Sequence, residues 1–264
     1  MSKVSIVFTG PCIHNWDKRS NYYKSFEKSI IQPIVNNYEL DIVIGCSSPK
    51  EEKDWQDNLC KKLPEKVNVL IFNNIFEHDL KSMKNRFSEE FCIHHDRENY
   101  MCHYGKYFET IKRMMLEENF KNTDYILKLR YDIIYHKEDR FDTQWFRESD
   151  KNVFCIGSTE FHSPGRWSER EGEHGYPNII SDQFIFSNKK NMILFSKLYG
   201  SSEIDYSNKI NSNPQKGIES ILANYILFHN IKCAAVEIRF TNPGKIRRPF
   251  WVEKRNQNIK KLNY

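Results

Sequence analysis

The sequence lacks three short signatures that would assign it to a common class of α/β enzyme. Its first apolar run, residues 4–8, is followed by Thr9, Gly10 and Pro11, so the G-x-G-x-x-G fingerprint of dinucleotide-binding folds is missing. One glycine at this turn also weakens a methyltransferase interpretation. The chain contains no G-x-x-x-x-G-K-[ST] phosphate loop and no G-x-S-x-G nucleophile turn. These absences argue against dinucleotide-binding enzymes, P-loop NTPases and α/β-hydrolases.

Paired cysteine motifs and long apolar runs are also missing. The seven cysteines are widely spaced and form no C-x-x-C pair, which predicts a reduced, cytoplasmic setting. The cysteines and histidines between residues 92 and 103 fit no common zinc spacing. No apolar run is long enough to span a membrane, and the first one is too short for a signal peptide, so we expect neither a transmembrane segment nor a leader.

The charge balance is close to even. The net charge of +5 comes from 40 basic and 35 acidic residues that are mostly interspersed. This mild excess suits an anionic small ligand, whereas scattered charges without an RNA-binding signature argue against a nucleic-acid partner. Hydrophobic residues make up 39% of the chain, but aromatic residues reach 14%, enough to supply a core.

Hydrophobic periodicity predicts alternating strands and helices. Strands are expected at residues 4–8, 40–45 and 67–72, with amphipathic helices at 21–35 and 51–63 between them. This β-α-β-α-β order implies a parallel sheet with right-handed crossovers. Further along, helices are expected at 100–119, 192–198 and 217–229, and strands at 125–135, 152–157, 184–186 and 233–240. No composition shift marks a second domain, so the chain is predicted to be a single α/β domain over residues 1–250 with a basic tail at 251–264.

The predicted strand at residues 125–135 carries two charges, Arg130 and Asp132, within an apolar run. An unpaired buried carboxylate is costly, so Asp132 must meet water, a cation or a ligand. Ligands of open α/β sheets bind at the carboxyl ends of strands. Asp132 and Arg130 at such an end could hold a divalent metal and a phosphate oxygen. A plain Arg130–Asp132 salt bridge explains the same residues equally well.

These features together resemble the GT-A glycosyltransferases, the nucleotide-diphospho-sugar transferase fold. The order of predicted elements carries the resemblance, together with the segment 125–135 and the segment that begins at Ser181, Asp182 and Gln183. Within that group the chain looks like small bacterial and large-virus enzymes of polysaccharide and glycoprotein glycan biosynthesis. The resemblance implies a mixed, mainly parallel, Rossmann-like sheet flanked by helices. Residues 1–135 would form the nucleotide-sugar-binding half and residues 136–250 the acceptor half.

The resemblance also assigns a donor site. Arg130-Tyr131-Asp132 matches the Asp-x-Asp motif of the family with only the last carboxylate kept, so Asp132 would bind Mn²⁺ or Mg²⁺ beside the diphosphate. Arg130 replaces the first carboxylate and could contact phosphate or ribose instead, which puts the metal in doubt. The remaining donor-site candidates are the turn after the first strand, a lysine on the preceding helix and a basic segment after the last strand: Thr9, Gly10, Lys106, Arg247 and Arg248.

On the acceptor side, the resemblance makes Asp182 the general base of an inverting transfer. A turn or helix N-cap role for Asp182 is nearly as well supported by the sequence. Trp167 and Tyr176, in the long polar segment 161–177, would stack on a sugar. The expected activity is transfer of a sugar from a nucleotide-diphosphate donor to a glycan hydroxyl. A non-catalytic nucleotide- or glycan-binding protein on the same fold is the alternative.

Overall fold

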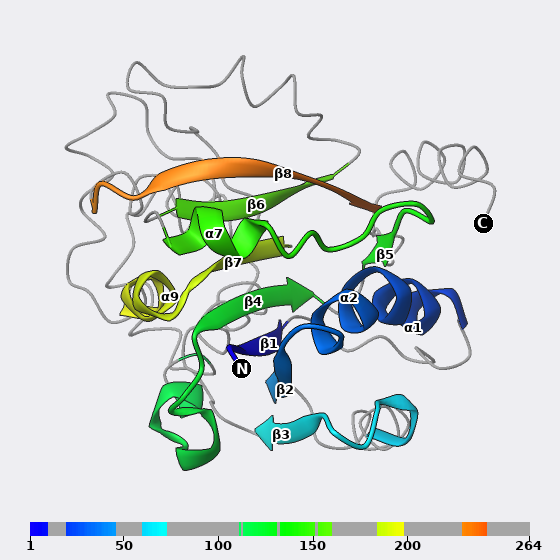
Figure 1. Cartoon of the computed structure of the whole chain (residues 1–264), viewed down its shortest axis with the longest axis horizontal. Helices are drawn as coiled ribbons and strands as arrows, with labels where there is room; N and C mark the ends of the chain where they lie inside the picture. Colours follow the sequence, from blue (N-terminus) through cyan, green and yellow to red (C-terminus); the bar gives the residue numbers. More distant parts are fainter. Residues whose placement is uncertain are drawn as a thin grey trace, which may run out of the picture.

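The computed structural model describes residues 1–9, 20–45, 60–72, 111, 113–130, 133–150, 153–159, 184–197 and 229–241. Within these ranges the strands form one eight-stranded sheet in the order β3-β2-β1-β4-β7-β6-β8-β5 (Figure 1). The strands are β1 (Lys3–Thr9), β2 (Glu39–Gly45), β3 (Asn68–Phe72), β4 (Tyr125–Arg130), β5 (Ile134–Tyr135), β6 (Val153–Thr159), β7 (Phe184–Asn188) and β8 (Lys232–Thr241).

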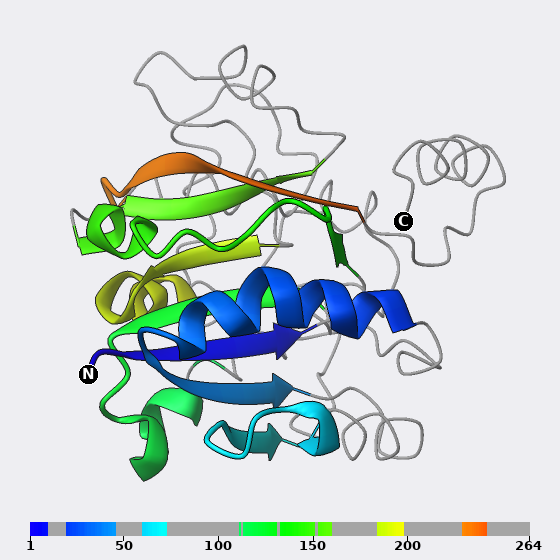
Figure 2. The same ribbon diagram turned by 45° about the vertical axis from the view of Figure 1, so that its right-hand side comes forward.

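The sheet is mixed and mainly parallel, as predicted. β1 pairs in parallel with β2 and β4, β2 pairs in parallel with β3, and β6 does so with β8. β7 is antiparallel to both β4 and β6, and β5 is antiparallel to β8. Figure 2 shows β1, β2 and β3 pointing the same way. Their carboxyl ends therefore meet at one edge of the sheet.

One face of the sheet is covered by a helical segment made of α1 (Ser20–Phe26), a π-helical turn η1 (Glu27–Ile31) and α2 (Gln32–Val35). The predicted helix 21–35 is thus confirmed, with one wide turn in its middle. That turn lets both Ile30 and Ile31 be buried. Pro33 lies in the first turn of α2, directly after the π-helical turn.

A second helix on this face was not predicted from the sequence. α7 (Trp145–Asp150) is short, and its packing depends on aromatic side chains. The Phe146 ring lies 4.2 Å from Tyr38, 4.5 Å from Tyr125 and 4.9 Å from Phe186, measured between ring centroids. Each contact joins residues far apart in the sequence. Tertiary packing, and not local propensity, therefore stabilises α7.

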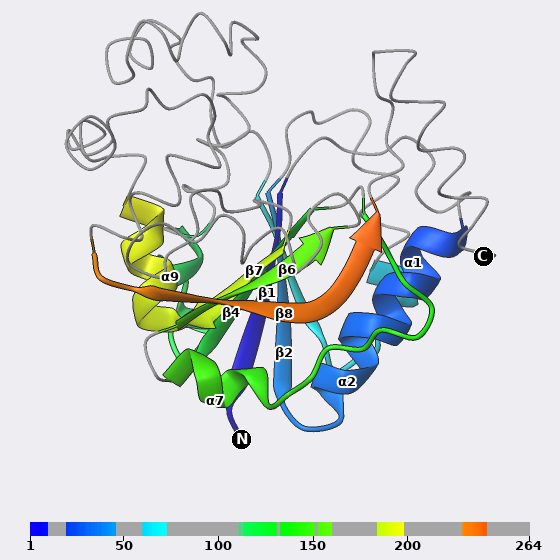
Figure 3. The ribbon, with the colours of Figure 1, turned by 90° about the horizontal axis from the view of Figure 1, so that it is seen from above.

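The opposite face of the sheet carries α9 (Lys189–Ser196), which Figure 3 shows on the other side from α1 and α2. Asn188 caps this helix, because its side chain accepts a hydrogen bond from the Asn191 backbone N–H at 2.9 Å. On this face Asn191 donates to the Ser187 hydroxyl at 3.0 Å, and the hydroxyls of Ser5 and Thr123 hydrogen-bond at 2.7 Å.

A buried ion pair ties the amino end of β1 to its neighbours. Asp41 on β2 is 1% exposed and lies 2.5 Å from the ammonium group of Lys3, measured from Oδ2 to Nζ. Asn68 on β3 donates to the other carboxylate oxygen at 2.9 Å. Lys3 also donates to the Asn119 carbonyl at 2.7 Å. These contacts join three strands and the segment before β4.

The prediction of one strand over residues 125–135 is wrong. β4 ends at Arg130, and Ile134–Tyr135 forms β5, which pairs with β8 at the far edge of the sheet. Ile133 and Tyr135 are buried in the same core as β4, so the apolar run is real but serves two strands. Apolar spacing cannot distinguish one long strand from two shorter strands, because the side chains are buried in both arrangements.

The other predicted strands are confirmed with ends shifted by one or two residues, which is the usual uncertainty of such boundaries. The predicted helix 192–198 begins three residues earlier, at Lys189. The predicted helix 100–119 is seen as helix at residue 111 and residues 113–116. The predicted helix 217–229 lies outside the described residues except for its last residue, His229, which is in a turn. The segment 161–177 and the tail 251–264 also lie outside the described residues.

Candidate functional site

The sheet has a topological switch point between β1 and β4. From β1 the sheet extends through β2 to β3 on one side, whereas β4 lies on the other side. In open α/β sheets, ligands bind outside the carboxyl ends of the strands at such a switch point, because the connections after the two central strands diverge there. The carboxyl ends of β1 and β4 are therefore the position at which this fold is expected to bind a ligand.

Two of the predicted donor-site residues occupy this position. Thr9 is the last residue of β1, Arg130 is the last residue of β4, and the two are register partners in the parallel ladder. They are 121 positions apart in the sequence, yet they lie side by side at the switch point. Arg130 is half-buried at the rim of the sheet. A guanidinium at this edge suits a phosphate or carboxylate ligand, since it can donate two parallel hydrogen bonds.

The alternation of side chains along β4 determines on which face of the sheet the Arg130 side chain lies. Leu127 and Leu129 belong to the core under α1 and α2. Because side chains alternate along a strand, Arg130 points to the opposite face, with Ile126 and Lys128. The guanidinium is thus separated from the aromatic core by the sheet.

The other predicted site residues lie outside the described residues. They are Gly10, Lys106, Asp132, Trp167, Tyr176, Asp182, Arg247 and Arg248. In the sequence, Gly10 directly follows Thr9, and Asp132 comes two residues after Arg130. The roles assigned to all eight stay predictions.

The metal prediction depends on Asp132 alone. Arg130, which stands where the resembled motif has its first carboxylate, is cationic and cannot coordinate a metal ion. Among the residues that the structure describes, no group of three or more His, Cys, Asp or Glu side chains could hold a metal. Asp132, the one carboxylate predicted to bind the metal, lies outside the described residues, so the metal role stays a prediction.

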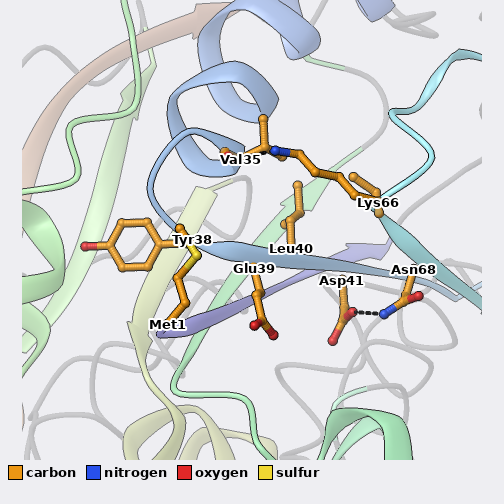
Figure 4. A pocket seen from close by; sticks show the side chains of 9 residues that line it. Met1, Val35, Tyr38, Glu39, Leu40, Asp41, Lys66 and Asn68 are labelled. Carbon is orange, nitrogen blue, oxygen red and sulfur yellow. Dashed lines mark hydrogen bonds between the residues drawn. The ribbon is translucent and has the colours of Figure 1, made fainter.

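A pocket lies at the opposite end of the sheet. Its volume is about 210 Å³, and it is lined by the start of β2, the start of β3 and the chain around them (Figure 4). Figure 4 shows Glu39, Asp41 and Asn68 on one side of β2, with Leu40 and Lys66 on the other. Asp41 is already bound by Lys3 and Asn68. This pocket is at the amino ends of the strands, away from the switch point.

Sequence reasoning overlooked one residue on β4. Lys128 is 1% exposed and is among the largest fully buried side chains of the described part of the chain. The signal was present in the sequence, because Lys128 is a third charge in the apolar run 125–135. A lysine flanked by leucines in a strand buried on both faces should have been singled out with Arg130.

A comparison with protein-family models and with curated proteins finds no match to this chain. Across the described ranges, no helix combines the length and the apolar character needed to cross a membrane. The class that the structure defines is an α/β fold with a candidate anion site at the switch point of its sheet.

Proposed function

We propose that the chain is a glycosyltransferase of the GT-A type, which moves a sugar from a nucleotide-diphosphate donor to a glycan hydroxyl. The pairing of Thr9 with Arg130 at the carboxyl ends of β1 and β4 carries the proposal. It puts a cation and a polar residue at the position where α/β folds hold nucleotides. The sequence resemblance supplies the reaction class.

In this proposal the donor diphosphate lies at the switch point. The acceptor oxygen attacks C1 of the sugar, the bond from C1 to the diphosphate breaks, and Asp182 takes the acceptor proton. Arg130 stabilises the negative charge that develops on the departing diphosphate, as fixed cations do in group transfer. Asp132 would hold Mn²⁺ or Mg²⁺, which supplies further neutralisation of the diphosphate when bound.

One observation favours the alternative of a non-catalytic nucleotide- or glycan-binding protein. Arg130 stands where the first carboxylate of a metal-binding motif is expected, so the site could bind a diphosphate without assisting its departure. Both proposals predict nucleotide binding at the same edge. Only the transferase cleaves the bond between sugar and diphosphate.

The experiment has two stages. A thermal-shift screen over UDP-, GDP-, CMP- and dTDP-sugars finds the donor, since a bound ligand raises the melting temperature by mass action. The donor is then incubated with the protein, with and without Mn²⁺, and release of the nucleoside diphosphate is measured. Release supports the transferase, whereas binding without release supports the alternative.

Arg130→Gln tests the location of the site. The variant should bind the donor at least tenfold more weakly, because a charge-assisted hydrogen bond is worth about 1.5–3 kcal/mol. Arg147→Gln is the matched control, since Arg147 is an exposed arginine on α7 and the same charge is removed. Equal donor affinity in the two variants would place the site elsewhere.

A further inference from the structure

The helical segment formed by α1 and η1 holds the part of the chain that follows Arg130. The Ser25 hydroxyl on α1 accepts a hydrogen bond from the Tyr135 backbone N–H of β5 at 3.3 Å. One helical turn further on, the Ser29 carbonyl accepts from the Phe141 backbone N–H at 2.7 Å. α1 also contacts β5 directly (Figure 1). Two backbone donors beyond Arg130 are thus bound to one side of the same helix.

The acceptor at Ser29 is explained by the wide turn of the helix and by the proline that follows it. In an α-helix, the donor to the Ser29 carbonyl would be the backbone N–H of residue 33, and Pro33 has none. Ser29 is 1% exposed, and a buried carbonyl needs a donor. The Phe141 N–H supplies one. A single π-helical turn inside an α-helix is frequent at functional sites.

The hydrogen bond from Tyr135 to Ser25 adds to a short strand ladder. β5 pairs with β8 at two positions, Ile134 with Thr241 and Tyr135 with Phe240. A strand pair of this length is weak by itself and needs packing against a helix. The buried side chain of Tyr135 supplies part of that packing. We therefore expect the Ser25 hydroxyl to contribute substantially to holding β5 against α1.

Both α1 and β5 follow strands that end at the switch point. β1 ends there at Thr9, and the next described element along the chain is α1. β4 ends there at Arg130, and the next described element is β5. Thr9 and Arg130 are register partners, so Ser25 joins the two parts of the chain that leave a pair of neighbouring strand ends. A ligand that restrains these strand ends should also restrain α1 relative to β5.

We propose that Ser25 is a positioning residue, which holds β5 against α1 and so keeps the carboxyl ends of β1 and β4 in the arrangement that binds the diphosphate. The inference rests on the proposed function, because it concerns the same site. Two coupled equilibria affect each other by the same factor, so ligand binding must strengthen the contact as much as the contact strengthens binding. One hydrogen bond of average net strength corresponds to roughly a fivefold change in an equilibrium constant, which limits the effect.

The test uses inorganic pyrophosphate in EDTA as the probe. In the wild-type protein, saturating pyrophosphate should slow amide hydrogen exchange at Tyr135 and Phe141 by roughly threefold to fivefold, measured by NMR. In Ser25→Ala, exchange at Tyr135 should be faster. Calorimetric titration of this variant should give a dissociation constant for pyrophosphate that is higher by the same factor. Ser25→Thr should restore both values, because it keeps the hydroxyl group.

Thr123→Val is the matched control. It removes a side-chain hydrogen bond to the Ser5 hydroxyl, made at 2.7 Å before the amino end of β4. The variant should lose stability, as Ser25→Ala does, but its affinity for pyrophosphate and its exchange at Tyr135 should stay unchanged. A general loss of stability is thereby separated from a loss of positioning at the switch point.

Each outcome supports or overturns the inference. If pyrophosphate binds but exchange at Tyr135 does not change, or if a folded Ser25→Ala variant keeps its full affinity, the inference is wrong and the proposed function stands. A wild-type protein that binds neither pyrophosphate nor any nucleotide sugar overturns both. If Ser25→Ala does not fold, the exchange measurement on the wild-type protein decides alone.

Discussion

Removing the ammonium group of Lys3 should destabilise the fold far more than a surface charge would. Asp41 is 1% exposed and the Lys3 side chain 14% exposed, so the pair is largely withdrawn from water. Lys3→Met leaves the Asp41 carboxylate buried, with the hydrogen bond from the Asn68 side-chain amide still in place. Breaking a buried pair from one side costs about 3–5 kcal/mol, because a charge stays behind without compensation.

Asp41→Asn should cost less than Lys3→Met. The Lys3 ammonium keeps its hydrogen bond to the Asn119 carbonyl and has some access to water. We expect a loss of about 1–2 kcal/mol, the usual range for an unsatisfied buried partner. The double variant removes both charges, so its loss should fall short of the sum of the single losses by about 2 kcal/mol.

Urea unfolding of the four proteins, followed by far-UV circular dichroism, measures this coupling. Lys28→Met serves as the control, since Lys28 is an exposed residue of η1 and its replacement should change stability by less than about 0.5 kcal/mol. Additive losses in the Lys3 and Asp41 variants would refute the reasoning. They would mean that the two charges do not depend on each other in the folded protein.

The remaining predictions concern the site and the dependence of stability on pH. Asp132→Asn should abolish or strongly weaken Mn²⁺-dependent donor binding and transfer, and full activity at matched stability would reject the metal role. Asp182→Asn should lower kcat by roughly 10²–10⁴-fold with nearly unchanged donor affinity, as expected for a general base; lost affinity or stability would instead favour a donor-site or capping role. Burial, and then the hydrogen bond to Asp150, raises the pKa of Tyr125 from 10 to about 12. Because the folded state holds this proton more tightly than the unfolded state, the stabilisation is present below pH 10 and is lost as the pH rises towards 12. The stability gap between the wild type and Tyr125→Phe should therefore narrow between pH 9 and pH 11.5 in thermal unfolding, and a constant gap would contradict this assignment.

The sequence alone determined the local elements of the first half of the sheet. β1, β2 and β3 follow from short apolar runs that end at turn residues, and the helical segment predicted at residues 21–35 follows from Phe26, Ile30 and Ile34 at helical spacing. These patterns are local, because the spacing of apolar residues along a helix or strand depends only on the backbone geometry of a few neighbouring residues. The sequence also singled out Thr9 and Arg130, whose pairing the structure describes.

Only the tertiary structure decided which segments become neighbours. The apolar run 125–135 predicted burial correctly, but it could not reveal that Ile134 leaves β4 and pairs with Thr241 on β8. α7 has little helical signal of its own and is held by the rings of Tyr38, Tyr125 and Phe186. The burial of Lys128 likewise depends on β1 and β7 lying on either side of β4. Apolar spacing in the sequence indicates which side chains are buried. Which strands pair, and where the charged side chains lie, depends on contacts between distant parts of the chain.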